Sequence, residues 1–312
     1  MPSRWGVEYP GGFGEVGPVR HGDLDEAVRP FRLLAGDPPA DGVAGHFTAA
    51  VWPNREVFTA DTGIVGYDRV IEGETGPLPA WLFPAGDGVR WAILVHGRGA
   101  HRAQMLRLVP TLHRAGITSL VISYRNDFPT CSDPSGRMHL GHREWRDLEA
   151  AAARAWHDGA RALVLGGMSM GGALIAAFMR RSALASKVVG CVFDAPALNY
   201  GPILRHMARQ RRIPGWLVPP VMTAAGWQAR IDWAALNHLH GGEPLAIPVL
   251  LVHGDRDLVV PVEISDAYAE AAPGAVSYLR VAGAGHVSAW NSAPERYDGA
   301  LAAFLEANGL SG

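Results

Sequence analysis

The segment 161-RALVLGGMSMGGALIAAFMRRS-182 decides the fold, because it joins a buried strand directly to a helix. Residues 161–167 form a short apolar run, which is typical of a strand buried on both faces. Residues 170–182 carry the apolar spacing of a helix, and glycine pairs lie on either side of Met-Ser-Met. Only small residues tolerate the crowding in so sharp a turn. The segment therefore predicts that Ser169 stands clear of its neighbours between the two elements.

The same alternation continues along most of the chain. We expect strands at 67–73, 78–84, 91–97, 117–125, 161–167, 187–196, 247–257 and 276–286, and helices at about 101–115, 143–159, 170–182, 262–272 and 294–308. Strands that alternate with helices favour right-handed crossovers and a mostly parallel sheet covered on both faces. Only the first two strands are expected to be antiparallel.

Two regions break this rhythm. Residues 197–245 are too long for one crossover helix, and we interpret them as a helical cap inserted between two late strands. Residues 1–60, rich in Gly, Pro and Asp, are expected to pack on or wrap the domain formed by 61–312. Residues 12–17 read GFGEVG and match a dinucleotide-binding pattern by letter. No strand is expected before them and no apolar helix after them, so we reject that function.

Composition excludes several classes of protein. The chain has 312 residues, of which 48% are apolar, and a net charge of −2, which suits one large domain without a basic face for nucleic acid. No apolar run reaches the ~18 residues of a membrane span, and the first residues do not resemble a signal peptide. Cys131 and Cys191 give no disulfide framework. We expect a cytoplasmic protein, and the sequence leaves its oligomeric state open, a homo-oligomer included.

Candidate catalytic residues lie at the expected carboxyl ends of the strands. Ser169 is the centre of G-x-S-x-G and is our candidate nucleophile. His286, which precedes the last helix, is the candidate general base. Asp257 is our preferred orienting acid, because it lies far enough into its loop to reach across. Asp255 and Asp194 remain alternatives for that role.

Other residues are expected to surround the nucleophile. The backbone N–H groups of Met170 and Arg98 are our candidate oxyanion donors. We also expect substrate contacts from Gly97, Met168, Trp216 and Trp290, although core packing is an equally good explanation for a tryptophan. The Arg-rich segment 205–212 predicts a solvated cap helix face, with binding of acidic substrates or an acyl-carrier partner as the alternative.

The sequence gives no support for a metal or another cofactor. His139 with His142, and His238 with His240, are the pairs that suggest metal binding. Neither pair has a third ligand at a suitable spacing, and no H-E-x-x-H pattern is present. We therefore expect no metal and no cofactor.

Taken together, these motifs resemble the α/β-hydrolase superfamily over about residues 65–310. Within it, the chain is similar to bacterial serine esterases and prolyl-oligopeptidase-type hydrolases. The segments that carry the resemblance are LVHGRGAHR (94–102), LVISYRND (120–127), HLGHREWRDLEAA (139–151), GGMSMGGA (166–173), IPVLLVHGDRDLVVPVE (247–263) and GAGHVSAWNSAPERY (283–297). The resemblance implies the Ser169, Asp257 and His286 triad and an oxyanion loop at 96–99. Met168 departs from the pattern, since close relatives more often carry a large aromatic residue there.

These expectations converge on a serine hydrolase that cleaves carboxylic esters. Its partner would be a small-molecule ester or acyl substrate. A thioesterase and a peptidase or amidase would use the same residues, so both remain alternatives. A hydrolase fold that only binds ligands is a further alternative, but the complete serine, acid and histidine set argues against it.

Overall fold

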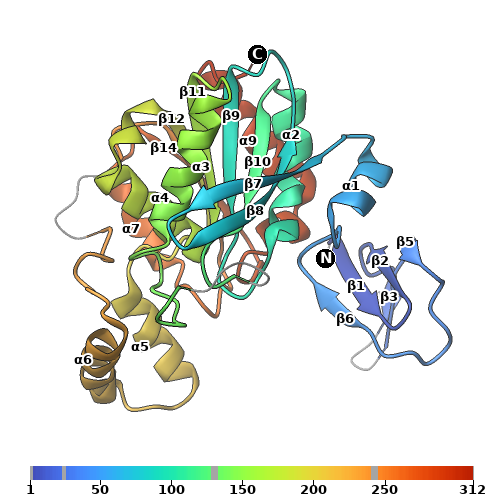
Figure 1. The fold of residues 1–312 in the computed structure, drawn as a ribbon. Helices are drawn as coiled ribbons and strands as arrows, with labels where there is room; N and C mark the ends of the chain where they lie inside the picture. The colour runs from blue at the N-terminus through green and yellow to red at the C-terminus, as the bar shows by residue number, and fades with distance from the viewer. Residues whose placement is uncertain (1–2, 23–25, 128–132, 240–244, 312) are drawn as a thin grey trace.

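The computed structural model describes residues 3–22, 26–127, 133–239 and 245–311, which are organised around an eight-stranded sheet (Figure 1). The strands are β7 (Tyr67–Gly73), β8 (Gly76–Phe83), β9 (Arg90–Val95), β10 (Thr118–Ile122), β11 (Ala162–Met168), β12 (Val188–Asp194), β13 (Val249–Gly254) and β14 (Val276–Val281). Their order across the sheet is β14-β13-β12-β11-β9-β10-β8-β7. β8 is antiparallel to both neighbours, and the other pairs are parallel. The predicted mostly parallel sheet is confirmed.

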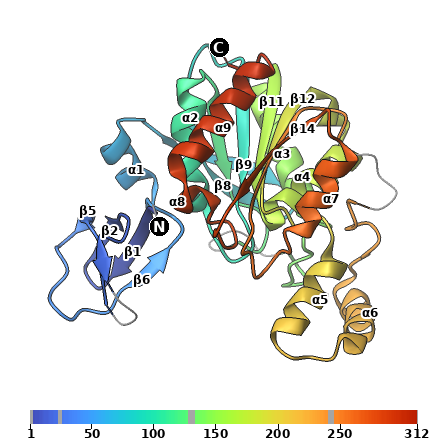
Figure 2. The same ribbon diagram turned by 180° about the vertical axis from the view of Figure 1, so that it is seen from behind.

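Helices cover both faces of this sheet (Figures 1 and 2). One face carries α3 (Trp145–His157), α4 (Met170–Arg181), the 3₁₀ helix η2 (Ala183–Lys187) and α7 (Glu263–Ala271). The other carries η1 (Arg102–Leu108), α2 (Val109–Arg114), α8 (Ala289–Ser292) and α9 (Pro294–Ala307). A buried apolar cluster lies under each layer. Each central strand therefore buries side chains on both faces, which explains its continuous apolar run.

Two expected elements differ from those observed. The helix expected at 101–115 is divided into η1 and α2, with Pro110 in the first turn of α2. Proline lacks an N–H and suits only that first turn, so the helix restarts there. The strand expected at 276–286 ends at Val281, and Gly283 then takes a φ of 75°. That left-handed conformation turns the chain out of the sheet.

Residues 3–62 contain regular structure that the sequence did not predict. Four short strands form an antiparallel sheet beside the main body: β1 (Trp5–Tyr9), β2 (Gly12–Val16), β5 (Phe31–Gly36) and β6 (His46–Thr48). A two-stranded ladder, β3 (His21–Gly22) with β4 (Ala27–Val28), and helix α1 (Arg55–Thr62) complete the region. The G-x-G-x-x-G letters largely fall within β2, so they form no phosphate-binding loop before a helix.

This small sheet is fastened to the main body through Asn291. The Asn291 side chain donates to the Arg4 and Ala49 carbonyl oxygens at 2.7 and 3.0 Å, and the Arg4 N–H donates to the Asn291 carbonyl oxygen at 2.8 Å. The Arg4 guanidinium also lies 5.3 Å from the ring centroid of Trp290. The region is thus held at the edge of the helical layer that contains α8. A domain boundary near residue 60 remains a prediction.

The predicted helical insertion is confirmed between β12 and β13. It contains α5 (Tyr200–Gln210), the 3₁₀ turn η3 (Gly215–Leu217) and α6 (Val218–Ala229). Both helices project beyond the sheet at one end of the molecule (Figure 1). α5 buries Tyr200, Ile203 and Ala208, whereas only Val218 of α6 is buried. We call residues 197–239 the cap.

Candidate active site

Ser169 occupies a strained turn between β11 and α4. Its φ is 52° and its ψ is −116°, a left-handed conformation that L-residues other than glycine rarely adopt. A Cβ atom on Gly167 would lie 2.6 Å from the Gly171 carbonyl carbon, and one on Gly171 would lie 2.2 Å from the Val95 carbonyl oxygen. Glycine is therefore required at both positions, which explains the flanking glycines in the sequence.

His286 connects Ser169 to Asp257. Its Nε2 atom lies 2.9 Å from the Ser169 Oγ, and its Nδ1 atom lies 2.7 Å from the Asp257 Oδ2. A neutral imidazole fits both contacts, with Nδ1–H donating to the carboxylate and Nε2 accepting from the serine hydroxyl. The three residues come from loops after β11, β13 and β14, so the carboxyl edge of the parallel strands brings them together.

Asp257 is held as a carboxylate. Its Oδ1 accepts hydrogen bonds from the Val259 and Val260 N–H groups at 2.7 and 2.9 Å. Burial raises the pKa of the Asp257 carboxyl, but hydrogen bonds from His253 and His286 outweigh burial, so the pKa lies below its usual range. An ionised Asp257 can orient His286 and stabilise the imidazolium that forms when His286 takes a proton.

His253 is a second histidine on the same carboxylate, and the sequence did not single it out. Its Nε2 lies 3.1 Å from both the Asp257 Oδ2 and the Val260 carbonyl oxygen. Since a carbonyl oxygen only accepts, Nε2 must carry the proton, and Nδ1 accepts from the Ser265 hydroxyl at 2.6 Å. The available signal was a polar residue at the end of a buried strand, four positions before the candidate acid.

The two alternative acids have other partners. Asp255 is exposed, and its Oδ1 accepts from the Gly283 N–H at 2.7 Å, which stabilises the turn after β14. Asp194 is fully buried, with its Oδ2 3.7 Å from the Arg107 Nη2. Asp257 is thus the acid for which a hydrogen bond to His286 is observed.

Arg107 is a buried cation beneath the site. Its Nη1 donates to the Asn291 Oδ1 at 2.8 Å, and its Nη2 donates to the Val287 carbonyl oxygen at 2.9 Å. The same Nη2 lies 2.7 Å from the Met168 Sδ. Arg107 therefore links the residue after His286 to the residue before Ser169. Arg107 was not among the residues predicted from the sequence, although one arginine within the apolar run MLRLVP (105–110) signals a buried, paired charge.

The loop after β9 lies against Ser169. A Cβ atom on Gly97 would be 3.2 Å from the Ser169 Cβ, so this loop approaches the serine as closely as glycine permits. The Gly97 N–H donates to the Gln104 Oε1 at 3.1 Å. Because that N–H already has a partner, the next one along the chain, Arg98, remains our candidate oxyanion donor together with Met170.

His96 and Tyr124 fix this loop from below. The buried His96 ring lies 2.9 Å from the Asp127 Oδ2 through Nε2 and 2.8 Å from the Gly97 carbonyl oxygen through Nδ1. The Tyr124 hydroxyl donates to the same carbonyl oxygen at 3.1 Å. These contacts leave the loop little freedom to move relative to the serine.

A cavity of about 130 Å³ opens beside Ser169, between the sheet edge and the cap. Its lining is mostly apolar and consists of Arg98, Leu140, Ser169, Met170, Ala197, Tyr200, Ile203, Leu204, Met207, Val259 and Val260. Leu204 and Met207 also line a groove of about 200 Å³ between α5 and α6. An apolar group bound at Ser169 would therefore contact the cap.

None of the four expected substrate contacts is among the residues that line this cavity. Met168 is fully buried against Arg107, and Trp290 is 2% exposed, donating to the Asp298 carboxylate at 3.0 Å from Nε1. Trp216 is 74% exposed on the cap. Met168 and Trp290 are therefore core residues. For Trp290 this is the core-packing alternative that the sequence left open. Gly97 alone of the four expected contacts lies against Ser169.

The other expected clusters are placed as follows. The arginines of 205–212 are exposed on the cap. Within the described ranges, no group of three or more His, Cys, Asp or Glu side chains is arranged to hold a metal ion. His240 and Cys131 lie outside the described residues. In the same part of the chain, every helix is too short or too polar to cross a membrane.

Comparison with solved structures identifies the architecture. An esterase from Pyrococcus furiosus is similar with a TM-score of 0.60 and 20% identity, over 80% of this chain and 95% of the esterase. A thermophilic esterase from Thermogutta terrifontis (TM-score 0.54, 19% identity) covers 78% of this chain and 99% of its own. The chain has the α/β-hydrolase fold.

Further comparisons bear on this fold alone. An alpha-beta serine hydrolase homologue from Coxiella burnetii has a TM-score of 0.52 and 20% identity, over 76% of this chain and 95% of its own. No protein-family model matches the sequence, and no curated protein sequence matches it significantly. The similarity shows the α/β-hydrolase fold and gives no support for the narrower prolyl-oligopeptidase-type group.

Proposed function

We propose that the protein is a serine hydrolase that cleaves carboxylic esters. The observation that carries this proposal is the hydrogen-bonded line from the Ser169 Oγ to the His286 Nε2, and from the His286 Nδ1 to the Asp257 Oδ2. This arrangement lies at the carboxyl edge of an α/β-hydrolase sheet, and two of the similar structures are esterases. A protein that only bound ligands would not require these hydrogen bonds or the strained backbone at Ser169.

The reaction follows from these contacts. The Ser169 Oγ attacks the ester carbonyl carbon while the His286 Nε2 takes the hydroxyl proton. The tetrahedral intermediate collapses, the bond to the alcohol oxygen breaks, and His286 returns the proton to that oxygen. Water then attacks the acyl-enzyme with His286 as base, releases the carboxylic acid and restores Ser169. Asp257 keeps the imidazole oriented throughout.

The oxyanion of the intermediate would accept hydrogen bonds from two backbone N–H groups. Met170 is the first residue of α4, and an N–H in the first turn of a helix has no partner within that helix. Arg98 supplies the second, from the loop held against Ser169. Losing one such donor typically costs about 3–4 kcal/mol of barrier.

The cavity favours an apolar acyl or alcohol group. Its volume of about 130 Å³ suits a short group, and the adjoining groove between α5 and α6 would extend the space for a longer one. Leu204 and Met207, which line both, would contact the substrate at the junction. A cytoplasmic location and the absence of a nucleic-acid partner remain predictions from composition.

A fluorophosphonate probe together with p-nitrophenyl esters tests the proposal. Wild type should be labelled at Ser169 and should hydrolyse the esters, whereas Ser169→Ala should lose labelling and about 10⁴- to 10⁶-fold in kcat. Ser186→Ala, which changes an exposed serine far from this turn in sequence, is the matched control and should retain both. Absence of labelling in the folded wild type would exclude the serine mechanism.

A further inference from the structure

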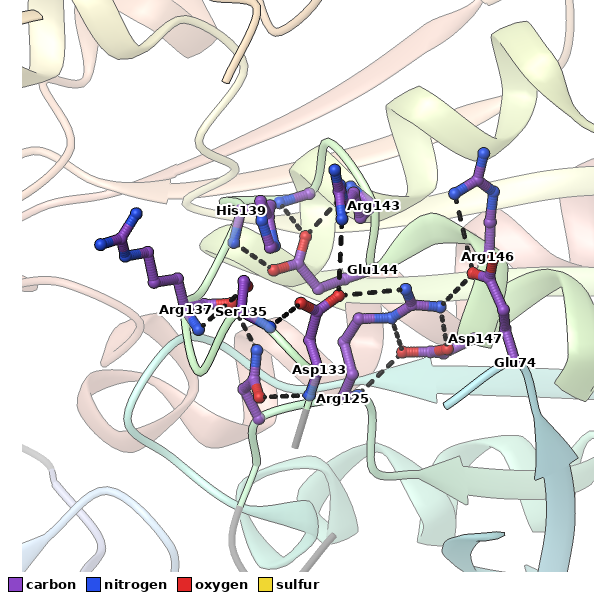
Figure 3. Close-up of polar contacts among 12 residues, drawn as sticks. Glu74, Arg125, Asp133, Ser135, Arg137, His139, Arg143, Glu144, Arg146 and Asp147 are labelled. Carbon is purple, nitrogen blue, oxygen red and sulfur yellow. Dashed lines mark hydrogen bonds and ion pairs between the residues drawn. The ribbon is translucent and has the colours of Figure 1, made fainter. Parts of the chain in front are cut away.

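A second, larger cavity lies between residues 133–143 and the C-terminal end of α6 in the cap. Its volume is about 500 Å³, within the range of roughly 300–1,000 Å³ that small-molecule sites occupy. Charged and polar side chains in its wall include Asp133, Ser135, Arg137, His139, Arg143 and Arg230. Figure 3 shows the part of this wall that belongs to the main body. None of these residues lines the cavity beside Ser169.

The wall is more cationic than anionic. Among the described residues of this wall the one carboxylate is Asp133, and it is already matched within the protein. The Asp133 Oδ1 accepts from the Ser135 N–H at 2.8 Å, and its Oδ2 lies 3.8 Å from both the Arg125 and Arg143 guanidinium groups. Three arginines, Arg137, Arg143 and Arg230, line the cavity together with Asp133. The surplus positive charge favours an anionic ligand.

The wall is also held rigidly (Figure 3). The buried Glu144 carboxylate accepts from the His139 N–H at 2.5 Å and from the Gly141 N–H at 2.9 Å. Below it, the buried Arg125 donates to both Asp147 carboxylate oxygens, at 2.7 and 2.9 Å. Arg125 is thus engaged with Asp147 and is not one of the arginines that would bind a ligand. A site whose wall is ordered in advance binds at a smaller entropic cost.

His139 provides a separate observation. Its side chain is 1% exposed, and its Nδ1 atom has no hydrogen-bond partner among the described residues. Burial lowers the pKa of His139 below its ordinary value, so the ring is neutral at pH 7. A buried polar atom without a partner is unfavourable, and a ligand with polar oxygens in the cavity would supply the missing bond.

The two cavities are close neighbours. Leu140 lines the cavity at Ser169, and the preceding residue, His139, lines the larger one. The Arg137 Nη1 donates to the Gln228 carbonyl oxygen, so it joins the main body to the end of α6 at this point. An anion between Arg143 on the body and Arg230 on the cap would add a second link across the same boundary.

We propose that the larger cavity binds the phosphate group of a small molecule, held by Arg143 and Arg230 with His139 as an additional polar contact. Guanidinium groups suit phosphate because their parallel N–H donors match its oxygens. The phosphate would belong either to the substrate, as in a nucleotide-containing acyl thioester, or to a separate ligand that fastens the cap. The site does not depend on Ser169 being catalytic.

Calorimetric titration of the Ser169→Ala protein with inorganic phosphate and with coenzyme A tests the site without turnover. Saturable binding is expected, and Arg143→Gln and Arg230→Gln should each weaken it about tenfold, the loss typical of one charge-assisted hydrogen bond. Arg209→Gln removes an exposed cap charge that lies outside this cavity and should bind like the parent. No saturable binding, or an equal loss in Arg209→Gln, would overturn the proposal.

Arg230 is exposed, so Arg230→Gln should fold even if Arg143→Gln does not, and thermal melting checks both variants. Hydrolysis then separates the two sources of phosphate. If the substrate carries it, Arg230→Gln raises KM for acetyl-coenzyme A about tenfold and leaves p-nitrophenyl acetate unchanged. If a separate ligand carries it, phosphate alters p-nitrophenyl acetate hydrolysis in wild type but not in Arg230→Gln. If the protein bound phosphate but the fluorophosphonate probe did not label Ser169, the esterase proposal would fail and the phosphate site would stand.

Discussion

Helices α4 and α6 both contain 12 residues, yet they are held very differently. Every residue of α4 from Met170 to Phe178 is buried, and the helix packs along β11 directly after Ser169. In α6 only Val218 is buried, and Trp227 is 87% exposed. The first helix fixes the position of Ser169, whereas the second forms an outer wall of the cap.

This difference in burial indicates which parts of the protein tolerate substitution. Displacing a side chain in a close-packed core affects all its neighbours, so the geometry at Ser169 is resistant to change. A helix with few buried contacts opens locally at a low cost in free energy. We therefore expect substitutions near Ser169 to abolish the reaction or unfold the protein, and substitutions in the cap to alter substrate preference. Four predictions test this contrast, from the largest effect to the smallest.

Asp257→Asn should have the largest effect. It keeps the shape but removes the acceptor that orients His286, so kcat for a p-nitrophenyl ester should fall about 10³- to 10⁴-fold with the fold intact. Steady-state kinetics with circular dichroism measures this. Asp255→Asn is the matched control, and its rate should stay within a few-fold of wild type. If Asp255→Asn lost more activity than Asp257→Asn, the assignment of Asp257 as the orienting acid would be wrong.

Arg107→Met tests the packed side through stability. It leaves the buried Asp194 carboxylate uncompensated and removes the hydrogen bond to the Val287 carbonyl oxygen. The free energy of unfolding, measured by urea denaturation, should fall by about 3–5 kcal/mol. Adding Asp194→Asn removes the unpaired charge and should restore part of that loss. If Arg107→Met alone were as stable as wild type, the pair of Arg107 with Asp194 would not stabilise the site.

Met207→Trp sharpens the contrast from the cap side. Met207 lies where the cavity at Ser169 meets the groove between α5 and α6, and a larger side chain should close that junction. We expect kcat/KM for a long acyl ester to fall roughly tenfold relative to the acetate ester. Comparing p-nitrophenyl esters of increasing acyl length measures the change. An equal fall for every ester would mean that the groove does not receive substrate.

Trp227→Ser should have the smallest effect. This side chain is largely exposed, so its removal should change the free energy of unfolding by less than about 0.5 kcal/mol. Thermal denaturation and acetate ester kinetics should both match wild type. A loss comparable to that of Arg107→Met would contradict the idea that α6 is only loosely held.

Much of the fold was predictable because its signals are local. The apolar runs at β9, β11 and β13 and the glycines around Ser169 each reflect contacts made within a few residues or within one sheet. The same reasoning placed Ser169, Asp257 and His286 at one edge of the sheet. It did not find the sheet of residues 5–48, because β5 is short and largely exposed and shows no clear alternation of buried and exposed residues.

The sequence by itself determined the order of the strands in the main sheet and of most helices that cover it, the sharp turn at Ser169 and the presence of an insertion after β12. Only the tertiary structure decided which residues meet. It placed the Asp257 carboxylate, and not that of Asp194, within hydrogen-bond distance of His286, paired Asp194 with Arg107, buried Trp290 and exposed Trp216. The reason is physical: periodicity and turn chemistry depend on neighbours along the chain, whereas burial and charge pairing depend on residues as far apart as Arg107 and Asn291, which only the packed molecule brings together.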